Sequence, residues 1–183
     1  MKFITPKRNT DGFVTTAGIF SKNRVDPASR FLADHFNQKI RGSVADLGAG
    51  WGYLSFMALH KSTWITDITL YEDNFNAIEN AKINIDNKKA KFEWTDITTN
   101  IRLERKFDAI ICNPPFHTGR KTAVNLGISF LIISSKMLKK SGRLWLVLNN
   151  HIPYEKELTR IFKNFYVLKE TKSYKIVIAE RPK

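Results

Sequence analysis

The sequence predicts an α/β fold in which helices cover both faces of one open, mostly parallel sheet. Strand-like and helix-like segments alternate five times along the chain, and two further strand-like segments close it. This alternation is typical of parallel sheets, because each crossover connection lays a helix over one face. We expect the last strand to insert antiparallel. Polar residues follow four predicted strands, at the edge where such sheets bind ligands, namely Asp46, Glu72, Asp96 and Asn113.

The predicted strands are short apolar runs, and the predicted helices have apolar residues at helical spacing. Asp26-Pro27 opens the first helix, with Asp26 as N-cap and Pro27 in the first turn. Gly142 marks the end of the fourth helix. We expect strands at residues 44–47, 64–71, 91–94, 107–112, 143–148, 165–168 and 174–179, and later helices at 53–60, 74–86, 123–138 and 155–163.

Length and composition indicate one globular domain with a basic surface. The 183 residues suffice for one core, and 43% of them are hydrophobic. We expect short strands and a loop at residues 1–25, as an N-terminal segment before a main domain at 26–183. Thirty Lys and Arg against 17 Asp and Glu give a net charge of +13. This excess favours a polyanionic partner, most simply nucleic acid, over the alternative of a merely basic protein.

The single cysteine, Cys112, excludes an internal disulfide and suits a reducing cytoplasm. The sequence has neither a run of about 18 apolar residues nor the apolar core of a signal peptide. We therefore expect a cytoplasmic protein that does not enter a membrane. The histidines show no metal-ligand spacing, so no metal site is predicted.

A glycine-rich turn after the first main strand is the first candidate binding site. Gly48, Gly50 and Gly52 stand at alternate positions before a predicted helix. Glycine tolerates the positive φ of a tight turn and lets a ligand approach the backbone. The spacing differs from the dinucleotide fingerprint G-x-G-x-x-G, and Asp46 would repel a pyrophosphate. Asp46 suits a cationic cofactor such as S-adenosylmethionine; the alternative is a simple strand-to-helix turn.

Two further acidic residues end the next two strands. Glu72 could accept hydrogen bonds from both ribose hydroxyls of a nucleoside, as such residues do in nucleoside-binding α/β folds. Asp96 could accept a hydrogen bond from an adenine amino group, with Ile97 packed on the ring. The alternative for both carboxylates is a solvated strand end.

Asn113-Pro114-Pro115-Phe116 is the most specific motif in the chain. Consecutive prolines fix the backbone in a rigid turn after a buried strand. Asn113 and the Pro114 carbonyl could then accept the two N–H groups of an exocyclic amine and turn its lone pair toward a sulfonium methyl. Such positioning accelerates transfer without a metal or a covalent intermediate. Phe116 offers a face for an extruded base, although an isolated Asn-Pro-Pro segment is usually only a turn.

These motifs together resemble class I S-adenosylmethionine-dependent methyltransferases that modify amino groups. More narrowly, they resemble the catalytic half of the 16S ribosomal RNA guanine-N2 methyltransferase C family, within the small-domain methyltransferases. The narrower resemblance spans roughly residues 16–180. It implies a Rossmann-like fold with a seven-stranded sheet and S-adenosyl-L-methionine as cofactor. It is carried by Gly18-Ile-Phe-Ser21, Val25-Asp26, the segment 126–144, Asn149 and Ile152-Pro153-Tyr154, besides Asn113-Pro-Pro-Phe-His117-Thr-Gly119.

The motifs and the resemblance together give the predicted site residues. The segment around Phe20 covers the active site in that family, which implies a substrate contact there. Substrate contacts are also expected from Phe116, from His117, whose alternative is simple solvation, and from Arg120 and Lys121 toward the RNA backbone. Catalytic roles are expected for Asn113, Pro114, Pro115 and Phe116, and cofactor contacts for Asp46, Leu47, Gly48, Ala49, Gly50, Gly52, Glu72, Asp96, Ile97 and Asn113.

The predicted activity is methyl transfer to an exocyclic amine, most specifically guanine N2 of 16S ribosomal RNA, in free RNA or in the small ribosomal subunit. The Asn-Pro-Pro-Phe core is shared with adenine-N6 and protein glutamine-N5 enzymes, so both stay open, as does a non-catalytic RNA-binding or ribosome-assembly factor. The family usually carries a second, degenerate domain on its N-terminal side, whereas about 25 residues precede the first helix here. Docking would then use the basic surface, a partner or self-association, in a monomer or a homodimer.

Overall fold

The computed structural model describes residues 6–99, 105–115 and 120–183, with the backbone alone for 120–123. A short antiparallel ribbon, formed by β1 (Lys7–Arg8) and β2 (Val14–Thr15), precedes the main sheet. The strands of the main sheet are β3 (Gly42–Leu47), β4 (Ile65–Glu72), β5 (Ala90–Trp94), β6 (Phe107–Cys112), β7 (Leu138–Asn149), β8 (Phe162–Glu170) and β9 (Tyr174–Pro182). The helices are α1 (Pro27–Asp34), α2 (Tyr53–Lys61), α3 (Phe75–Asn84), α4 (Arg120–Met137) and α5 (Glu155–Ile161).

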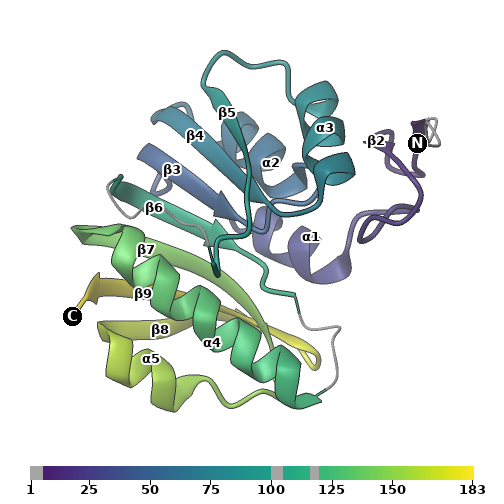
Figure 1. The fold of residues 1–183 in the computed structure, drawn as a ribbon. Coiled ribbons are helices and arrows are strands. Elements are labelled where there is room, and N and C mark those ends of the chain that lie inside the picture. Colours follow the sequence, from purple (N-terminus) through teal and green to yellow (C-terminus); the bar gives the residue numbers. More distant parts are fainter. Residues whose placement is uncertain (1–5, 100–104, 116–119) are drawn as a thin grey trace.

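The seven strands of the main sheet lie in the order β5-β4-β3-β6-β7-β9-β8 (Figure 1). The pairs from β5 through β7 are all parallel. The last strand, β9, inserts between β7 and β8 and is antiparallel to both. The predicted fold class and the antiparallel last strand are therefore confirmed.

Helices pack on both faces of the sheet, each over its own hydrophobic core. On one face α1, α2 and α3 cover residues such as Val44, Ile111 and Val147, and on the other α4 and α5 cover Leu47 and Leu148 (Figure 1). Alternate residues of each strand therefore belong to different cores, as the pleat of a strand requires. We call the first face the α1 face.

The start of α1 follows the predicted capping pattern. The Asp26 carboxylate accepts a hydrogen bond from the backbone N–H of Ser29 at 2.8 Å, and Pro27 occupies the first turn. Asn74 caps α3 in the same way through Ala77. These side chains satisfy backbone donors that the first helical turn leaves without intrahelical partners.

The prediction that Gly142 ends the fourth helix was wrong. The helix ends at Met137, and Gly142 is buried within β7. A Cβ atom on Gly142 would lie 2.8 Å from Leu138 Cδ2 and 3.0 Å from the carbonyl oxygen of Phe107. Close packing against β6, and not helix termination, requires glycine at this position.

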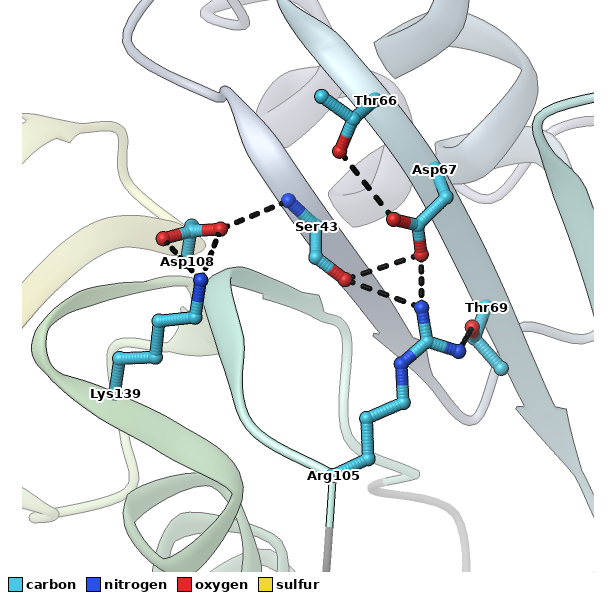
Figure 2. A network of polar contacts seen from close by, with 7 residues as sticks. All are labelled: Ser43, Thr66, Asp67, Thr69, Arg105, Asp108 and Lys139. Carbon is cyan, nitrogen blue, oxygen red and sulfur yellow. Dashed lines mark hydrogen bonds and ion pairs between the residues drawn. The ribbon is translucent and has the colours of Figure 1, made fainter.

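The amino ends of β3, β4 and β6 are joined by a network of polar contacts (Figure 2). Arg105 contacts Asp67 and donates hydrogen bonds to Thr69 Oγ1 at 2.9 Å and to Ser43 Oγ at 3.2 Å. Asp108 accepts hydrogen bonds from the Ser43 N–H at 2.9 Å and from the Lys139 ammonium. This network fixes the strands at the edge opposite to their carboxyl ends.

Gly42 is the position at which this network constrains the backbone most directly. Its φ is +71°, and a Cβ atom there would lie 2.4 Å from the Asp108 carboxylate. We expect Gly42→Ala to lower the free energy of unfolding by about 3 kcal/mol, because it adds a steric clash to backbone strain. Gly12→Ala is the matched control, since Gly12 has a φ of +86° with open space around it, and should cost only about 1 kcal/mol. Equal losses in urea denaturation would show that Asp108 sets no constraint.

Candidate active site

A cavity of about 540 Å³ lies at the carboxyl edge of the sheet. Its walls come from the residues that follow the parallel strands and from the start of α1 and the body of α4. Nine predicted site residues line it, namely Phe20, Gly48, Gly50, Glu72, Asp96, Ile97, Asn113, Pro114 and Pro115. The sheet thus brings together side chains that are far apart in the sequence, as its topology predicts.

The glycine turn has the backbone conformation that its sequence predicts. Gly48, Gly50 and Gly52 have φ values of +69°, +56° and +92°. A Cβ atom on Gly52 would lie 2.8 Å from Ile85 Cδ1, so glycine also allows the turn to pack against the end of α3. Gly48 and Gly50 present their backbone to the cavity.

Glu72 connects this turn to the next strand end. One carboxylate oxygen accepts a hydrogen bond from the Gly50 N–H at 2.8 Å, and the other accepts one from the Asn74 N–H at 2.9 Å. Burial raises the pKa of Glu72 to about 7. Each oxygen keeps a second lone pair, so the carboxylate could still accept hydrogen bonds from a ligand.

Asp96 is held differently, by its own turn. Its Oδ1 accepts hydrogen bonds from the backbone N–H of Thr98 at 2.8 Å and from the Thr98 hydroxyl at 2.6 Å. These hydrogen bonds lower the pKa of Asp96 below its usual value. Asp96 is therefore an ionised acceptor on the cavity wall, beside the buried side chain of Ile97.

Asp46 does not line the cavity, in contrast to the expected direct contact with a cofactor. Its side chain is fully buried and accepts hydrogen bonds from Ser55, through Oγ at 2.7 Å and the backbone N–H at 3.1 Å. Burial raises the pKa of Asp46 to about 7. Strand alternation turns it toward α2, so Asp46 lies behind the glycine turn and anchors the helix that follows.

Three other predicted cofactor contacts also lie outside the cavity wall. Leu47 belongs to the core under α4 and α5, and Gly52 is buried at the start of α2. Ala49 lines an adjoining cleft of about 50 Å³ beside Trp51, which shares Gly48 and Asn113 with the cavity. The sequence motif predicted the turn correctly, but it did not separate residues that shape the turn from those that face the cavity.

Asn113 is oriented by the start of α1. Its side-chain nitrogen donates hydrogen bonds to the Asp26 carboxylate at 2.9 Å and to the Ser29 hydroxyl at 2.8 Å. Both amide protons are thus engaged, which leaves the side-chain oxygen as the group that can accept a hydrogen bond from a ligand. No local sequence pattern predicts this contact, because Asp26 lies 87 positions from Asn113.

The predicted substrate contacts are described only in part. Phe20 is half exposed on the cavity wall, and its carbonyl accepts a hydrogen bond from Trp51 Nε1 at 3.2 Å. Phe116 and His117 lie outside the described residues. Arg120 and Lys121 begin α4, but the structure does not describe their side chains.

The cavity also has wall residues that the predicted site did not include. The strand ends contribute Tyr71, Asn149 and Tyr174, and the helices contribute Ala28, Leu126 and Phe130, among others. The period-two alternation of the strands could have indicated Asn149 and Tyr174, because both continue the α1 face past buried core residues. Within the described ranges, no helix is long and apolar enough to span a membrane, and no group of His, Cys, Asp and Glu side chains could hold a metal ion.

The chain is similar to known methyltransferases in both sequence and fold. The model of the methyltransferase small domain matches residues 11–178. Ribosomal RNA small subunit methyltransferase C of Haemophilus influenzae is 34% identical, over 87% of this chain and 48% of its own length. Ribosomal RNA large subunit methyltransferase G of Pseudoalteromonas translucida is 29% identical, over 96% of this chain and 48% of its own length. The chain therefore spans about half the length of these curated relatives.

One solved structure is similar to the chain in both sequence and fold. The 16S rRNA guanine-N2 methyltransferase RsmC of T. thermophilus, in complex with AdoMet and guanosine, superimposes with a TM-score of 0.78. It is 28% identical to this chain and matches 97% of it, over 50% of the relative's own chain. The family model, the fold and the motifs agree: the chain belongs to the methyltransferase small domain family.

Proposed function

We propose that this chain transfers a methyl group from S-adenosylmethionine to an exocyclic amine, specifically guanine N2 of ribosomal RNA. The observation that carries this proposal is the orientation of Asn113. Asp26 and Ser29 hold its amide nitrogen, so its oxygen is the group available to accept a hydrogen bond from the amine. The family agrees with S-adenosylmethionine as the methyl donor.

The cofactor fits the half of the cavity formed by the first three parallel strands. Glu72 would accept hydrogen bonds from the ribose hydroxyls, and Asp96 with Ile97 would contact the adenine. The backbone of Gly48 and Gly50 allows close approach beside them. Carboxylates and bare backbone suit a ligand that carries a sulfonium and an ammonium group and lacks phosphate.

The protein's part in the reaction is positioning. When bound, the cofactor supplies an electrophilic methyl group; its carbon–sulfur bond breaks as the new carbon–nitrogen bond forms, and the amine then loses a proton to water. Asn113 and the Pro114 carbonyl would accept hydrogen bonds from the two amine N–H groups, which orients the nitrogen lone pair toward the sulfonium methyl. Preorganised acceptors of this kind stabilise the positive charge that develops on the nitrogen.

Three observations support ribosomal RNA guanine as the substrate. The net charge of +13 favours a phosphate polymer over a protein. Curated relatives are ribosomal RNA methyltransferases, and the solved relative holds guanosine. Within this class we favour the 16S RNA, because the solved relative acts on it; the 23S RNA is the second candidate, because relatives named large subunit methyltransferase G match this chain over a similar length.

Methylation of ribosomal subunits that lack native methyl groups tests this proposal. Purified protein and labelled S-adenosylmethionine are incubated with 30S subunits, 50S subunits and the naked RNAs, and the products are digested to nucleosides for mass spectrometry. The proposal predicts labelled N2-methylguanosine in 16S RNA. The same product in 23S RNA would show that the substrate is the large-subunit RNA. Labelled N6-methyladenosine would show that the target base is adenine and not guanine. Label in protein alone would show that the substrate is not RNA.

Removal of the Asn113 amide should affect turnover far more than cofactor binding. Asn113→Ala deletes an acceptor for the amine, so we expect turnover to fall by about 100-fold or more. The dissociation constant for S-adenosylmethionine, measured by calorimetry, should stay nearly unchanged. Near-normal turnover would refute the catalytic role.

The Ser29 hydroxyl should act through Asn113. Ser29→Ala removes one of the two acceptors that orient the amide and should lower turnover about 5- to 10-fold, the usual range for one hydrogen bond. Asp26 still caps α1 in this variant, so the melting temperature should hold. Ser135→Ala, which removes a hydroxyl bonded within α4, serves as control; equal turnover in both variants would contradict the positioning role.

Cofactor affinity should depend on pH through Glu72. The ionised carboxylate is the better acceptor for ribose hydroxyls, and its pKa lies near 7. Affinity should therefore rise as the pH increases through about 7 and level off above it. Calorimetric titrations with S-adenosylmethionine between about pH 6 and pH 8 measure this rise. The Glu72→Gln side chain cannot ionise, so this variant should show no rise in affinity with pH. The same pH profile in both proteins would rule out Glu72 as the titrating group.

A further inference from the structure

The cavity continues past Asn113 to a second end, formed by β7 and β9. Asn149 and Tyr174 line this end, and neither belongs to the residues expected to hold the cofactor. We propose that this end holds the target nucleobase, with Asn149 donating a hydrogen bond to it and the Tyr174 ring packed against it. This inference rests on the proposed function and names the part of the site that recognises the base.

Strand alternation places these side chains on the same face of the sheet as Asn113. Ile111, Val147 and Ile176 belong to the core of the α1 face. Asn113 follows Ile111 by two residues, and Asn149 follows Val147 by two. Tyr174 precedes Ile176 by two residues. Side chains two apart in a strand point the same way, and Tyr174 packs against that core.

The strand register brings Asn149 and Tyr174 side by side. They are directly opposite each other in the antiparallel pair of β7 and β9, where Cβ atoms lie about 5 Å apart. In the parallel pair of β6 and β7, Cys112 is opposite Leu146, so Asn113 lies next to the position two residues before Asn149. Asn149 and Tyr174 therefore form a pair on the same face as Asn113, two residues further along the sheet.

The amide of Asn149 is oriented opposite to that of Asn113. Its oxygen accepts a hydrogen bond from the His151 N–H at 3.0 Å, so we infer that its nitrogen is the group that donates to a ligand. Asn113 presents an acceptor and Asn149 presents donors. A base with an exocyclic amine beside a ring nitrogen or carbonyl oxygen complements this pair, because its amine donates to Asn113 while its acceptor receives a hydrogen bond from Asn149.

Apolar side chains line other parts of the cavity wall. Phe20 and Ala28 lie on the α1 side, and Pro115, Leu126 and Phe130 lie on the α4 side. These side chains and the Tyr174 ring give the cavity apolar surfaces on which a planar base can pack. Proteins that take a base out of its stack read it in this way, by packing on its faces and hydrogen bonding to its edge.

Guanosine binding tests the inference without depending on catalysis. Saturation-transfer NMR with S-adenosylhomocysteine present should show guanosine bound to the wild-type protein, and Asn149→Ala should weaken the binding about tenfold. Asn150→Ala is the matched control: Asn150 donates to the Thr171 carbonyl and does not line the cavity, so its loss should leave binding within about twofold of wild type. Tyr174→Leu should also weaken binding, whereas Tyr174→Phe should not.

The outcomes separate this inference from the proposed function. Equal guanosine binding in Asn149→Ala and wild type, or no guanosine binding by the wild type, would overturn the base pocket. Loss of binding that accompanies a lower melting temperature and weaker cofactor binding would also count against it, because it would indicate a structural role for Asn149. Guanosine binding that depends on Asn149, in a protein that transfers no methyl group to ribosomal RNA, would support the pocket and refute the proposed function.

Discussion

The carboxylate of Asp26 is the contact on which the geometry of this site depends. One oxygen of this side chain caps α1 through the Ser29 N–H and also accepts a hydrogen bond from the Asn113 amide. This contact therefore links the start of α1 to the orientation of Asn113. Without this contact the amide could rotate, and its oxygen and nitrogen would exchange places relative to a substrate. The helix cap thus leaves the Asn113 oxygen as the group that can accept a hydrogen bond from a ligand.

The main cavity is acidic, whereas the protein as a whole is basic. The protein carries a net charge of +13, yet Asp26, Glu72, Asp73 and Asp96 all line its main cavity. An acidic cavity in a basic protein attracts a small cation to the site and a polyanion to the surface around it. Burial of Glu72 and Asp46 has a cost, seen in their raised pKa values. A bound cation would reduce that cost, because it favours the ionised form of a nearby carboxylate.

The sequence was sufficient to predict the architecture and the edge of the sheet at which the cavity lies, because both follow from the order of strands and from polar residues at strand ends. It was insufficient wherever a side chain's direction depended on packing. Asp46 was expected in the cavity but turns toward Ser55, and Gly142 was expected as a helix end but allows close packing on β6. The contact between Asp26 and Asn113 joins distant segments, so no local pattern indicates it. Asn149 and Tyr174 follow the strand alternation, but their pairing depends on the observed register.

In the proposed reaction, the Asn113 oxygen accepts a hydrogen bond from the amine that receives the methyl group. A crystal structure of this protein with S-adenosylhomocysteine and guanosine would test this contact. We expect the guanine N2 atom within hydrogen-bonding distance of Asn113 Oδ1 and of the Pro114 carbonyl oxygen, with the amine facing the cofactor sulfur and the ring between Tyr174 and the opposite wall. A guanosine that binds in the cavity with its ring nitrogens or ribose against Asn113, and its amine turned away from the sulfur, would contradict it.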